Sequence, residues 1–376
     1  MALITYLTRI QFEAGAVRLL GAELEALGAS APLIVTDRGI VAAGIIDQVI
    51  AASGLPASVA VFDGTPENPT EAAAHAGVEA YRAGGCDSVV AVGGGSAIDL
   101  AKAVALLVTH DGPLAQYAAI LGGLDRITAD KPPVIAVPTT AGTGSEVGRA
   151  ALLTLEDGRK LGFISPHMIP SVAICDPELT TGLPAYLTAA TGMDTVTHCI
   201  ETYLSPRYNP VAEAIALDGL GRAVRALPRA VADGRDIAAR TDMMMAALQG
   251  GLTFQKGLGA VHSMSHPLGG LKTVKLHHGT LNAVLLPAVL TFNRPEAGRK
   301  YEAIARVLGL EPNADLADAL RRFAADLGLP ATLSAMGVPR DVLPEMAEHA
   351  VRDHSTATNP RKAEVGDFLA MLEASY

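Results

Sequence analysis

The chain contains no tryptophan, and aromatic residues make up only 4% of it. Proteins that bind nucleic acid bases or sugar rings use aromatic side chains as stacking surfaces. A chain with so few aromatic residues has little material for such a surface. The composition therefore favours a small aliphatic substrate over a base or a large sugar.

Cysteine is also scarce. Cys86, Cys175 and Cys199 are odd in number and lack CxxC spacing, and the first residues lack the charged and apolar regions of a signal peptide. Both features predict a protein of the reducing cytoplasm. Cys199 directly follows His198, but neighbouring residues on a helix point about 100° apart. We therefore expect Cys199 to be a small buried residue rather than a ligand or a catalytic group.

An excess of positive charge and long apolar runs are missing as well. The net charge is −10 without a run of lysines or arginines to offset it, which argues against a nucleic acid partner. The apolar runs at residues 101–108 and 284–290 are far shorter than the ~20 residues that span a bilayer, which argues against a membrane protein. Because hydrophobic residues make up 49% of the chain and charged residues 18%, we expect a folded globular protein.

The 376 residues suffice for two domains of roughly 100–200 residues each. In the first part of the chain, short β-branched runs alternate with alanine-rich helical stretches, which is typical of a parallel sheet covered on both faces. Helical periodicity dominates the second part. We predict an α/β domain at residues 1–178, a helical domain at residues 179–376 and a cleft between them. The expected strands lie at residues 32–36, 58–62, 88–92, 134–137 and 172–174.

An aspartate and several histidines have the spacing of metal ligands. Asp194 and His198 are four residues apart in a segment of helical character, so both side chains lie on one helix face and can share a cation. His262 and His266 repeat the spacing, and Pro267 should end or kink their helix. One such pair alone is more often a surface hydrogen bond than a ligand set.

The neighbouring pair His277 and His278 strengthens the metal interpretation. Apolar residues flank these segments, and imidazoles buried among apolar residues need polar partners. One cation shared by three segments would satisfy them together. Oxygen and nitrogen donors without cysteine suit Fe²⁺, Zn²⁺ or Mn²⁺.

Two glycine-rich loops follow predicted strands. Residues 93–96 (Gly-Gly-Gly-Ser) lead from a strand into a helix, where backbone N–H groups and the helix dipole favour a phosphate. The second loop, residues 138–146, carries four hydroxyl groups and two glycines. The first loop lacks the GxGxxG order of the dinucleotide fingerprint, and a tight turn without a ligand is the alternative. Two such loops at successive strand ends favour a nucleotide.

Asp37 comes just after the first predicted strand. Its carboxylate could accept a hydrogen bond from the adenosine ribose and repel a 2′-phosphate, which would select NAD over NADP. A solvated aspartate in a turn is the alternative interpretation.

Taken together, these motifs resemble the iron-containing (group III) alcohol dehydrogenases. The matching segments extend over nearly the whole chain, at residues 93–99, 138–147, 176–180, 188–198 and 259–269. The resemblance implies a Rossmann-like domain followed by an all-α domain, in the architecture shared with dehydroquinate synthase. It implies an NAD-dependent enzyme that interconverts a small primary alcohol or hydroxy acid with its aldehyde or ketone. We also expect a homo-oligomer, with a dimer as the simplest form.

The resemblance also implies roles for individual residues. Asp194, His198, His262 and a histidine before Gly279 would hold the metal, with Fe²⁺ expected and Zn²⁺ or Mn²⁺ as alternatives. His266, one helical turn from His262, would relay a proton or position the substrate. The expected NAD contacts are Asp37, Asn68, Gly94, Gly95, Ser96, Thr139, Thr140, Thr143, Lys160 and Leu179.

The chain departs from the family pattern at two positions. The last metal ligand of the family usually follows a proline, whereas His277 and His278 both precede Gly279 here; we assign His278, with His277 as the alternative. Arg149 stands where many members carry an uncharged residue. A guanidinium there suits a substrate carboxylate or phosphonate, and an arginine on the surface is the competing interpretation.

Two other function classes fit less well. A lyase or cyclase of the dehydroquinate synthase type would need basic residues around a polyanionic substrate, and the helical half shows no such cluster. A non-catalytic protein that binds a nucleotide or a metal is the other alternative. Maleylacetate reductases, relatives without the metal, typically lose the Asp/His set that this chain keeps.

Overall fold

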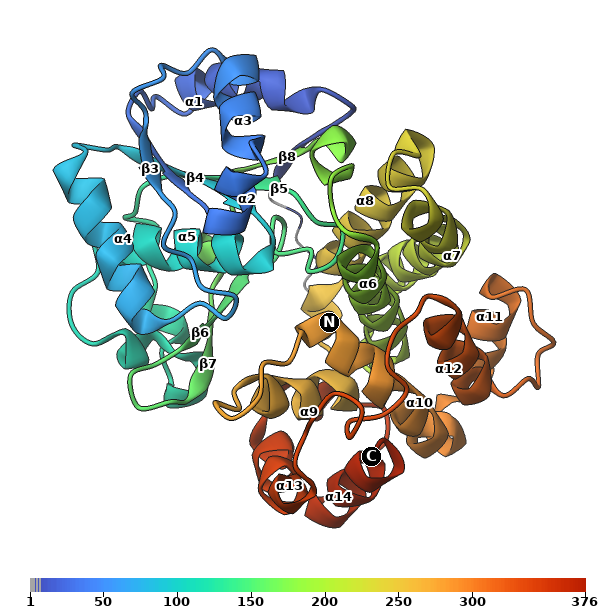
Figure 1. Ribbon diagram of the computed structural model, residues 1–376. Helices are drawn as coiled ribbons and strands as arrows, with labels where there is room; N and C mark the ends of the chain where they lie inside the picture. The colour runs from blue at the N-terminus through green and yellow to red at the C-terminus, as the bar shows by residue number, and fades with distance from the viewer. Residues whose placement is uncertain (1–3, 5, 7) are drawn as a thin grey trace. The chain divides into compact units, whose positions relative to one another are not determined.

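The computed structural model describes residues 4, 6 and 8–376. The chain divides into two compact units, each of which is described by itself. The α/β unit consists of Tyr6–Thr140 and Gly144–Gly182, and the helical unit includes Leu183–Tyr376 and Ala141–Thr143. Figure 1 shows the elements of both units, and the expected combination of a parallel-sheet domain and a helical domain is confirmed.

A six-stranded sheet organises the α/β unit, and all of its strand pairs are parallel. Gly93 pairs with Pro138 in the register of the two central strands. The two glycine-rich loops therefore leave the same edge of the sheet from neighbouring strands. In spatial order the strands are β1 (Arg9–Phe12), β8 (Val172–Cys175), β5 (Val134–Pro138), β4 (Ser88–Gly93), β2 (Pro32–Val35) and β3 (Ala60–Phe62).

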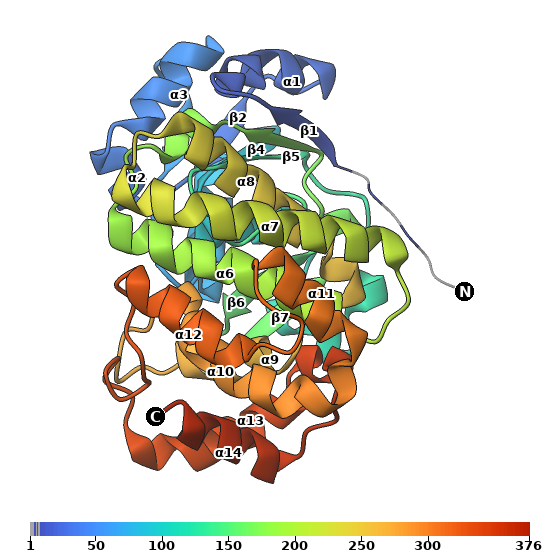
Figure 2. The same cartoon turned by 90° about the vertical axis from the view of Figure 1, so that its right-hand side faces the viewer.

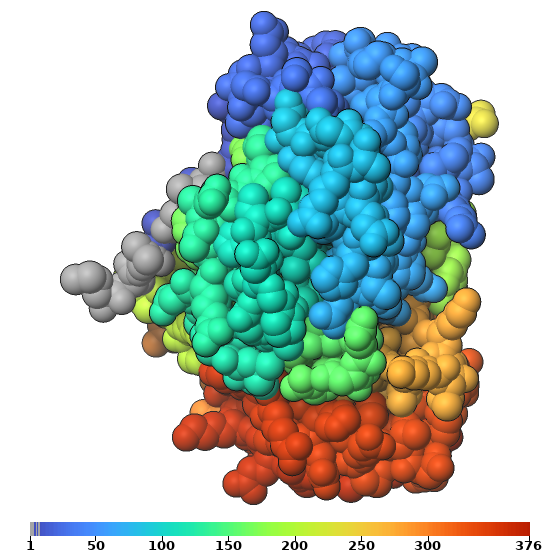
Figure 3. Space-filling model, turned by 90° about the vertical axis from the view of Figure 1, so that its left-hand side faces the viewer, coloured from blue at the N-terminus to red at the C-terminus, as the bar shows by residue number. Residues whose placement is uncertain are grey.

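Alternate residues of the central strands serve two separate cores. Val89 and Ala91 pack on one face with α4 (Glu71–Ala83) and α5 (Gly95–Leu107). Val90 and Val92 pack on the other face with α1 (Leu20–Ala26) and α3 (Ile45–Ser53). Both faces are thus covered, as continuous apolar strands require. Figure 3 shows α4 and the segment after α5 forming the outer surface over the first of these cores.

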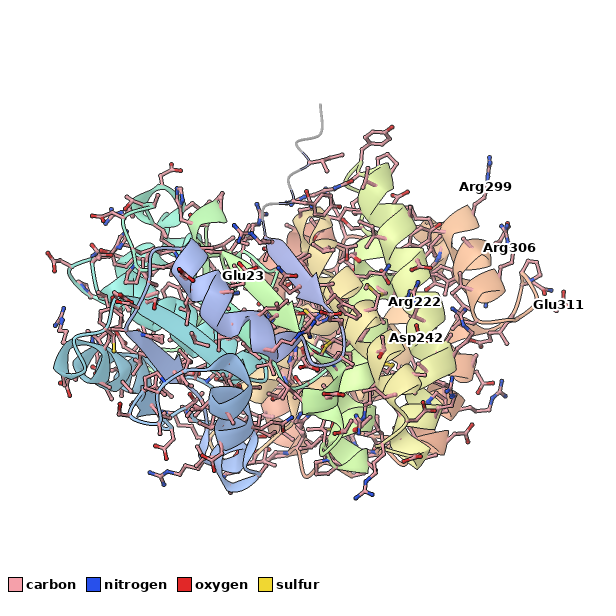
Figure 4. The ribbon with its side chains drawn as sticks, turned by 90° about the horizontal axis from the view of Figure 1, so that it is seen from above. Glu23, Arg222, Asp242, Arg299, Arg306 and Glu311 are labelled. Atoms are coloured by element: carbon pink, nitrogen blue, oxygen red, sulfur yellow. The ribbon has the colours of Figure 1, made fainter. Side chains whose placement is uncertain are left out.

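The sequence did not reveal β1 at the sheet edge. This strand is only four residues long, and two of them, Arg9 and Gln11, are polar. Their side chains each donate a hydrogen bond of 2.6 Å to the carboxylate of Glu23 on α1. Glu23 is labelled in Figure 4. Polar and apolar residues alternate in this strand, but over only four positions, which is the shortest run that signals a strand. A further pair of antiparallel strands, β6 (Ala150–Thr154) and β7 (Lys160–Ile164), forms a hairpin.

Long antiparallel helices build the helical unit, and α6, α7 and α8 pack against one another in series (Figure 2). Arg222 of α7 ties two of them together, because it donates to Asp218 of its own helix and to Asp242 of α8 at 2.8 Å each (Figure 4). The helices are α6 (Ala185–Leu204), α7 (Pro210–Ala232), α8 (Ile237–Leu252), α9 (Ala260–Gly269), α10 (His278–Ala297), α11 (Arg299–Val307), α12 (Leu316–Asp326), α13 (Leu343–Arg352) and α14 (Val365–Ala374).

Pro267 lies inside α9, which continues to Gly269. We expected Pro267 to end or kink this helix; Pro267 does not itself end α9, which ends two residues later. A proline costs a helix the hydrogen bond to the carbonyl four residues earlier. Pro267 lies two residues before the end of α9, and the helix tolerates the loss of this one bond there.

The three cysteines are free, and Cys175 and Cys199 are fully buried. Burial raises the pKa of Cys199 to about 12, which keeps the thiol protonated and unreactive. The expectation of a small buried residue at this position is confirmed. Among the described residues, no helix is both long enough and apolar enough to cross a membrane.

A fully buried lysine fixes the second glycine-rich loop to α5. Lys102 is 1% exposed, and its Nζ donates to the hydroxyl and carbonyl of Ser145 and to the carbonyls of Gly148 and Ala150, at 2.7–2.9 Å. Ser145 Oγ in turn donates to Asp99 at 2.6 Å. Burial lowers the pKa of Lys102 to about 8, although nearby Asp99 opposes this shift. One side chain thus satisfies the backbone carbonyls that lead from the loop into β6.

We predict that Lys102→Met lowers the free energy of unfolding by about 3–5 kcal/mol, because it leaves buried carbonyls and Asp99 without their cation. Urea denaturation of the purified protein measures this change. The matched control is Lys362→Met at an exposed lysine, which should change stability by less than about 0.5 kcal/mol. Equal effects of the two substitutions would contradict the structural role of Lys102.

Candidate metal centre and nucleotide-binding loops

Helix α6 carries the first two candidate metal ligands on one face. Asp194 and His198 are 4% and 3% exposed. His198 Nε2 lies 3.4 Å from Asp194 Oδ1. The four-residue spacing therefore brings a carboxylate oxygen and an imidazole nitrogen to the same point, as the sequence predicted.

Two other helices bring imidazoles to the same carboxylate oxygen. His262 near the start of α9 places its Nε2 3.8 Å from Asp194 Oδ1, and its ring stacks on that of His198 at 4.7 Å between centroids. His278, the first residue of α10, places its Nε2 3.7 Å from the same oxygen. Donor atoms of Asp194, His262 and His278 lie within 4.8 Å of one another and could hold one cation.

The close approach of α10 to α6 brings His278 to this point. A Cβ atom at Gly279 would lie 2.1 Å from the carbonyl oxygen of Ala190 and 3.3 Å from Asp194 Cβ. Only glycine leaves room for the two backbones at this distance. His277 precedes the helix as its N-cap residue and does not belong to the group of converging donors.

Asn282 is a neighbour of the site that the sequence analysis missed. It is fully buried, and its Nδ2 lies 2.7 Å from Asp194 Oδ1, 3.3 Å from His262 Nε2 and 3.2 Å from His278 Nε2. When the imidazoles are neutral and present these nitrogens as acceptors, the amide nitrogen has only two hydrogens for the three acceptor atoms. The donor set therefore has more lone pairs than protein hydrogens to satisfy them, and a divalent cation fits it.

The pKa values show how the charges at this point are balanced. Although burial alone would raise it, the imidazoles of His198, His278 and His262 hold the pKa of Asp194 well below its usual value. Burial lowers the pKa of His198 to about 4, against the attraction of Asp194. Burial would lower the pKa of His262 too, but Asp194 and Glu201 raise it to about 9. Without a cation, His262 thus holds one proton between the carboxylates of Asp194 and Glu201. A bound cation could replace this proton.

His266 lies one helical turn beyond His262 and has its own carboxylate. Its Nδ1 donates to Asp353 Oδ2 at 2.9 Å, and its ring stacks on that of His278 with centroids 5.8 Å apart. Nearby imidazoles lower the pKa of Asp353 despite burial. Asp353 was not singled out from the sequence, because its contact with His266 spans 87 residues.

In the α/β unit, the first glycine-rich loop lies beside the second. Gly93 has a φ of +156°, and a Cβ there would lie 2.7 Å from Ala97 of α5. Gly94 precedes α5 as its N-cap, and a Cβ at this residue would lie 3.3 Å from Thr140 Oγ1. Gly94, Gly95 and Ser96 are partly exposed, so the backbone amides at the start of α5 could face a phosphate.

Two more of the predicted NAD contacts pair with each other near this turn. Lys160 Nζ donates to Asn68 Oδ1 at 3.0 Å, and Ser96 Oγ donates to the carbonyl of Glu67, next to Asn68. Burial lowers the pKa of Lys160, against the attraction of Asp99. The loop at residues 67–69 is thus joined both to the start of α5 and to the hairpin.

The remaining predicted contacts differ in their surroundings. Asp37 is the N-cap of α2 (Arg38–Ala42) and accepts from Ile40 N at 3.0 Å. Thr139 is 2% exposed, whereas Thr143 is half-buried in the segment that belongs to the helical unit. Leu179 is 3% exposed and packs in the core of the sheet, so packing alone accounts for its side chain. Its role at a cofactor stays a prediction.

Arg149 is exposed, and its backbone carbonyl accepts from Ser165 N at 3.0 Å. An exposed guanidinium fits both of the earlier interpretations, a substrate contact and a surface charge. Its role therefore also stays a prediction.

Comparison with known proteins identifies the family. The family model of iron-containing alcohol dehydrogenases matches residues 8–177, and the model of their C-terminal domain matches residues 188–376. The chain belongs to the iron-containing alcohol dehydrogenase family. The expected resemblance is confirmed.

The similarity extends over the whole length of individual relatives. The 4-hydroxybutyrate dehydrogenase of Cupriavidus necator is 54% identical and is matched over 100% of both chains. Among solved structures, a 1,3-propanediol oxidoreductase has a TM-score of 0.93 at 37% identity over 100% of both chains. A sulfoacetaldehyde reductase from Bifidobacterium kashiwanohense, in complex with NAD⁺, has a TM-score of 0.89 at 29% identity, over 100% of this chain and 98% of the other.

The neighbouring histidines before Gly279 provide a test of the metal centre. We predict that His278→Ala removes most of the bound metal per chain, because it deletes a donor atom 3.7 Å from Asp194 Oδ1. His277→Ala is the matched control and should keep the metal content of the unmodified protein. Elemental analysis after loading with Fe²⁺ or Zn²⁺ measures both variants. Loss of metal from His277→Ala alone would reverse the assignment.

Proposed function

We propose that the chain is a metal- and NAD-dependent dehydrogenase that interconverts a small hydroxy acid or primary alcohol with its aldehyde or ketone. The observation that carries this proposal is the convergence of Asp194 with three imidazoles from three helices. The similarity to a 4-hydroxybutyrate dehydrogenase favours a short hydroxy acid with a terminal hydroxyl. The NAD⁺ complex of a relative with the same fold supports NAD as the cofactor.

Asp194, His198, His262 and His278 are the proposed metal ligands. Their oxygen and nitrogen donors suit Fe²⁺, Zn²⁺ or Mn²⁺, and the family favours iron. When bound, such a cation supplies Lewis-acid polarisation of the substrate hydroxyl, and NAD⁺ supplies the acceptor for the hydride. Three of the four donors are buried, which would limit the access of water to a cation bound there.

His266 is the proposed acceptor for the hydroxyl proton. Its Nδ1–H is committed to Asp353, so its lone pair is on Nε2, which can accept a proton. The ionised carboxylate of Asp353 stabilises the imidazolium that results. In the reverse direction His266 returns the proton as the aldehyde is reduced.

The glycine-rich loops of the α/β unit are the proposed NAD site. Gly94, Gly95 and Ser96 at the start of α5 offer backbone amides to the pyrophosphate. Lys160 and Asn68, which are hydrogen-bonded to each other, offer a cation and an amide beside this turn. Thr139, Thr140 and Thr143 would supply hydroxyls for the ribose or the nicotinamide.

The proposal is tested with purified protein that is stripped of metal and then loaded with Fe²⁺, Zn²⁺ or Mn²⁺. We expect NADH formation from 4-hydroxybutyrate with at least one of these metals, and none without metal. We also expect a larger kcat/KM for 4-hydroxybutyrate than for 1-butanol, which lacks the carboxylate. Absence of NADH formation from any alcohol or hydroxy acid with metal bound would favour a non-catalytic binding protein.

The same substrate pair tests the role of Arg149. We expect Arg149→Met to lower the preference for 4-hydroxybutyrate over 1-butanol by about tenfold, the lower end of the range for a charged hydrogen bond because the side chain is exposed. Arg149→Lys should restore the preference in part. Arg159→Met, at an exposed arginine of the β6–β7 hairpin, is the control and should leave it unchanged. An unchanged preference in Arg149→Met would leave Arg149 as a surface charge.

The carboxylate of Asp37 is the proposed selector of NAD over NADP. Because Asp37 also caps α2, the informative substitution is Asp37→Ser, which keeps a helix-capping oxygen but removes the negative charge. We expect the ratio of kcat/KM for NAD⁺ and NADP⁺ to move toward NADP⁺, since a 2′-phosphate is no longer repelled. An unchanged ratio in a stably folded variant would exclude Asp37 from the cofactor site.

A further inference from the structure

A buried carboxylate lies behind one of the proposed metal ligands. Glu201 of α6 is 4% exposed. Its Oε2 accepts from His262 Nδ1 at 2.6 Å, and its Oε1 accepts from Val261 N at 2.7 Å. Both carboxylate oxygens are therefore occupied by donors from α9. The helix that provides Asp194 and His198 thus also provides the partner of His262.

These two contacts determine which nitrogen of His262 has a free lone pair. A hydrogen on Nδ1 is required for the bond to Glu201, so in the neutral imidazole, the form that binds a cation, the lone pair is on Nε2. Nε2 is the atom that lies 3.8 Å from Asp194 Oδ1. An imidazole binds a cation through the nitrogen without a hydrogen, and an acceptor on the other nitrogen fixes the tautomer and the ring orientation.

The backbone around the start of α9 leaves room for this carboxylate. A Cβ atom at Gly259 would lie 2.8 Å from Glu201 Oε1 and 2.9 Å from Asn359 Oδ1. These two oxygens accept from the first N–H groups of α9, those of Val261 and Ala260. A negative charge at a helix N-terminus is favourable, so the position of Glu201 is fixed independently of His262.

We infer that Glu201 is a positioning residue for the metal centre, which holds His262 in the tautomer and orientation that present Nε2 to the cation. This inference rests on the proposed metal site. It assigns no contact between Glu201 and the metal or the substrate. The carboxylate acts through His262 alone.

A glutamine cannot replace Glu201 in this arrangement. Val261 N and His262 Nδ1 are both donors, whereas a glutamine amide has one acceptor oxygen and one donor nitrogen. If the amide nitrogen faces His262, the imidazole must move its hydrogen to Nε2 and can no longer bind the cation there. If the amide nitrogen faces Val261, its N–H group and the N–H of Val261 oppose each other away from water, which lowers stability.

The experiment measures metal affinity directly, without an activity assay. Metal-free protein is titrated with Co²⁺ and with Zn²⁺ against a chromophoric chelator, and the visible spectrum of the Co²⁺ form is recorded. We expect Glu201→Gln to weaken the affinity by about 10–100-fold and to change the Co²⁺ spectrum. Glu201→Asp, which keeps the charge but shortens the side chain, should fall between Glu201→Gln and the unmodified protein.

Two further variants separate positioning from general stability. Glu213→Gln is the control, because Glu213 is a partly buried glutamate of the helical unit that is bonded to Lys256 and Lys300 and to no proposed ligand. It should keep the metal affinity. Gly259→Ala should weaken metal affinity as Glu201→Gln does, because its Cβ displaces the carboxylate without changing it. This second variant tests the inference even if Glu201→Gln does not fold.

The possible results distinguish this inference from the proposed function. Unchanged affinity and an unchanged Co²⁺ spectrum in Glu201→Gln would overturn it, and so would a lower melting temperature as the sole effect. A change of affinity in Glu213→Gln as large as in Glu201→Gln would also overturn it. If the unmodified protein binds neither Co²⁺ nor Zn²⁺, the metal site itself fails, and the inference fails with it.

Discussion

The contact of α10 with α6 at Gly279 is the constraint on which the proposed metal centre depends. The two helix backbones approach so closely that a single methyl group at this position would overlap the Ala190 carbonyl. This approach places His278, the residue before Gly279, over the face of α6 that carries Asp194. It also places Asn282, one turn further along α10, against the same carboxylate. A larger residue would separate the helices and remove two polar groups from the site together.

Buried charge in the two units is balanced in different ways. In the α/β unit, Lys102 is surrounded by carbonyls and Asp99, so the cation is part of the protein and fixes a loop. In the helical unit, Asp194 faces imidazoles and an amide whose hydrogens are too few for the acceptors present. The first arrangement already contains its own cation. The second presents converging oxygen and nitrogen donors without one, and this difference favours the proposal that it is a functional site rather than a structural one.

Much of the fold could be predicted from the sequence, because its signals are local. Apolar β-branched runs predicted five of the six strands of the main sheet, namely β2, β3, β4, β5 and β8. The four-residue spacing predicted that Asp194 and His198 lie together, as they do. The strand β1 was missed, because its alternation of polar and apolar residues covers only four positions. Pro267 did not itself end α9, because one lost hydrogen bond near a helix end is tolerated.

The polar residues around the metal ligands could not be predicted in the same way. Glu201 meets His262 across 61 residues, Asp353 meets His266 across 87, and Asn282 meets Asp194 across 88. Neither spacing nor composition reports such contacts, which arise only when the helices pack. Glu201 and Asn282 lie in helical segments that the sequence already indicated, but nothing local distinguishes them from other buried polar residues.

Because the proposed donors come from three helices, metal binding would be coupled to the packing of the helical unit. A cation that binds Asp194 and His198 of α6, His262 of α9 and His278 of α10 favours only the folded arrangement, since the unfolded chain has no such site. Changes that loosen these helices should therefore weaken metal binding even at a distance from the donors. Conversely, the bound cation would strengthen the attachment of α9 and α10 to α6. The short contacts of Asn282 and Glu201 between the same helices fit this coupling, because they keep the donors in place before the cation arrives.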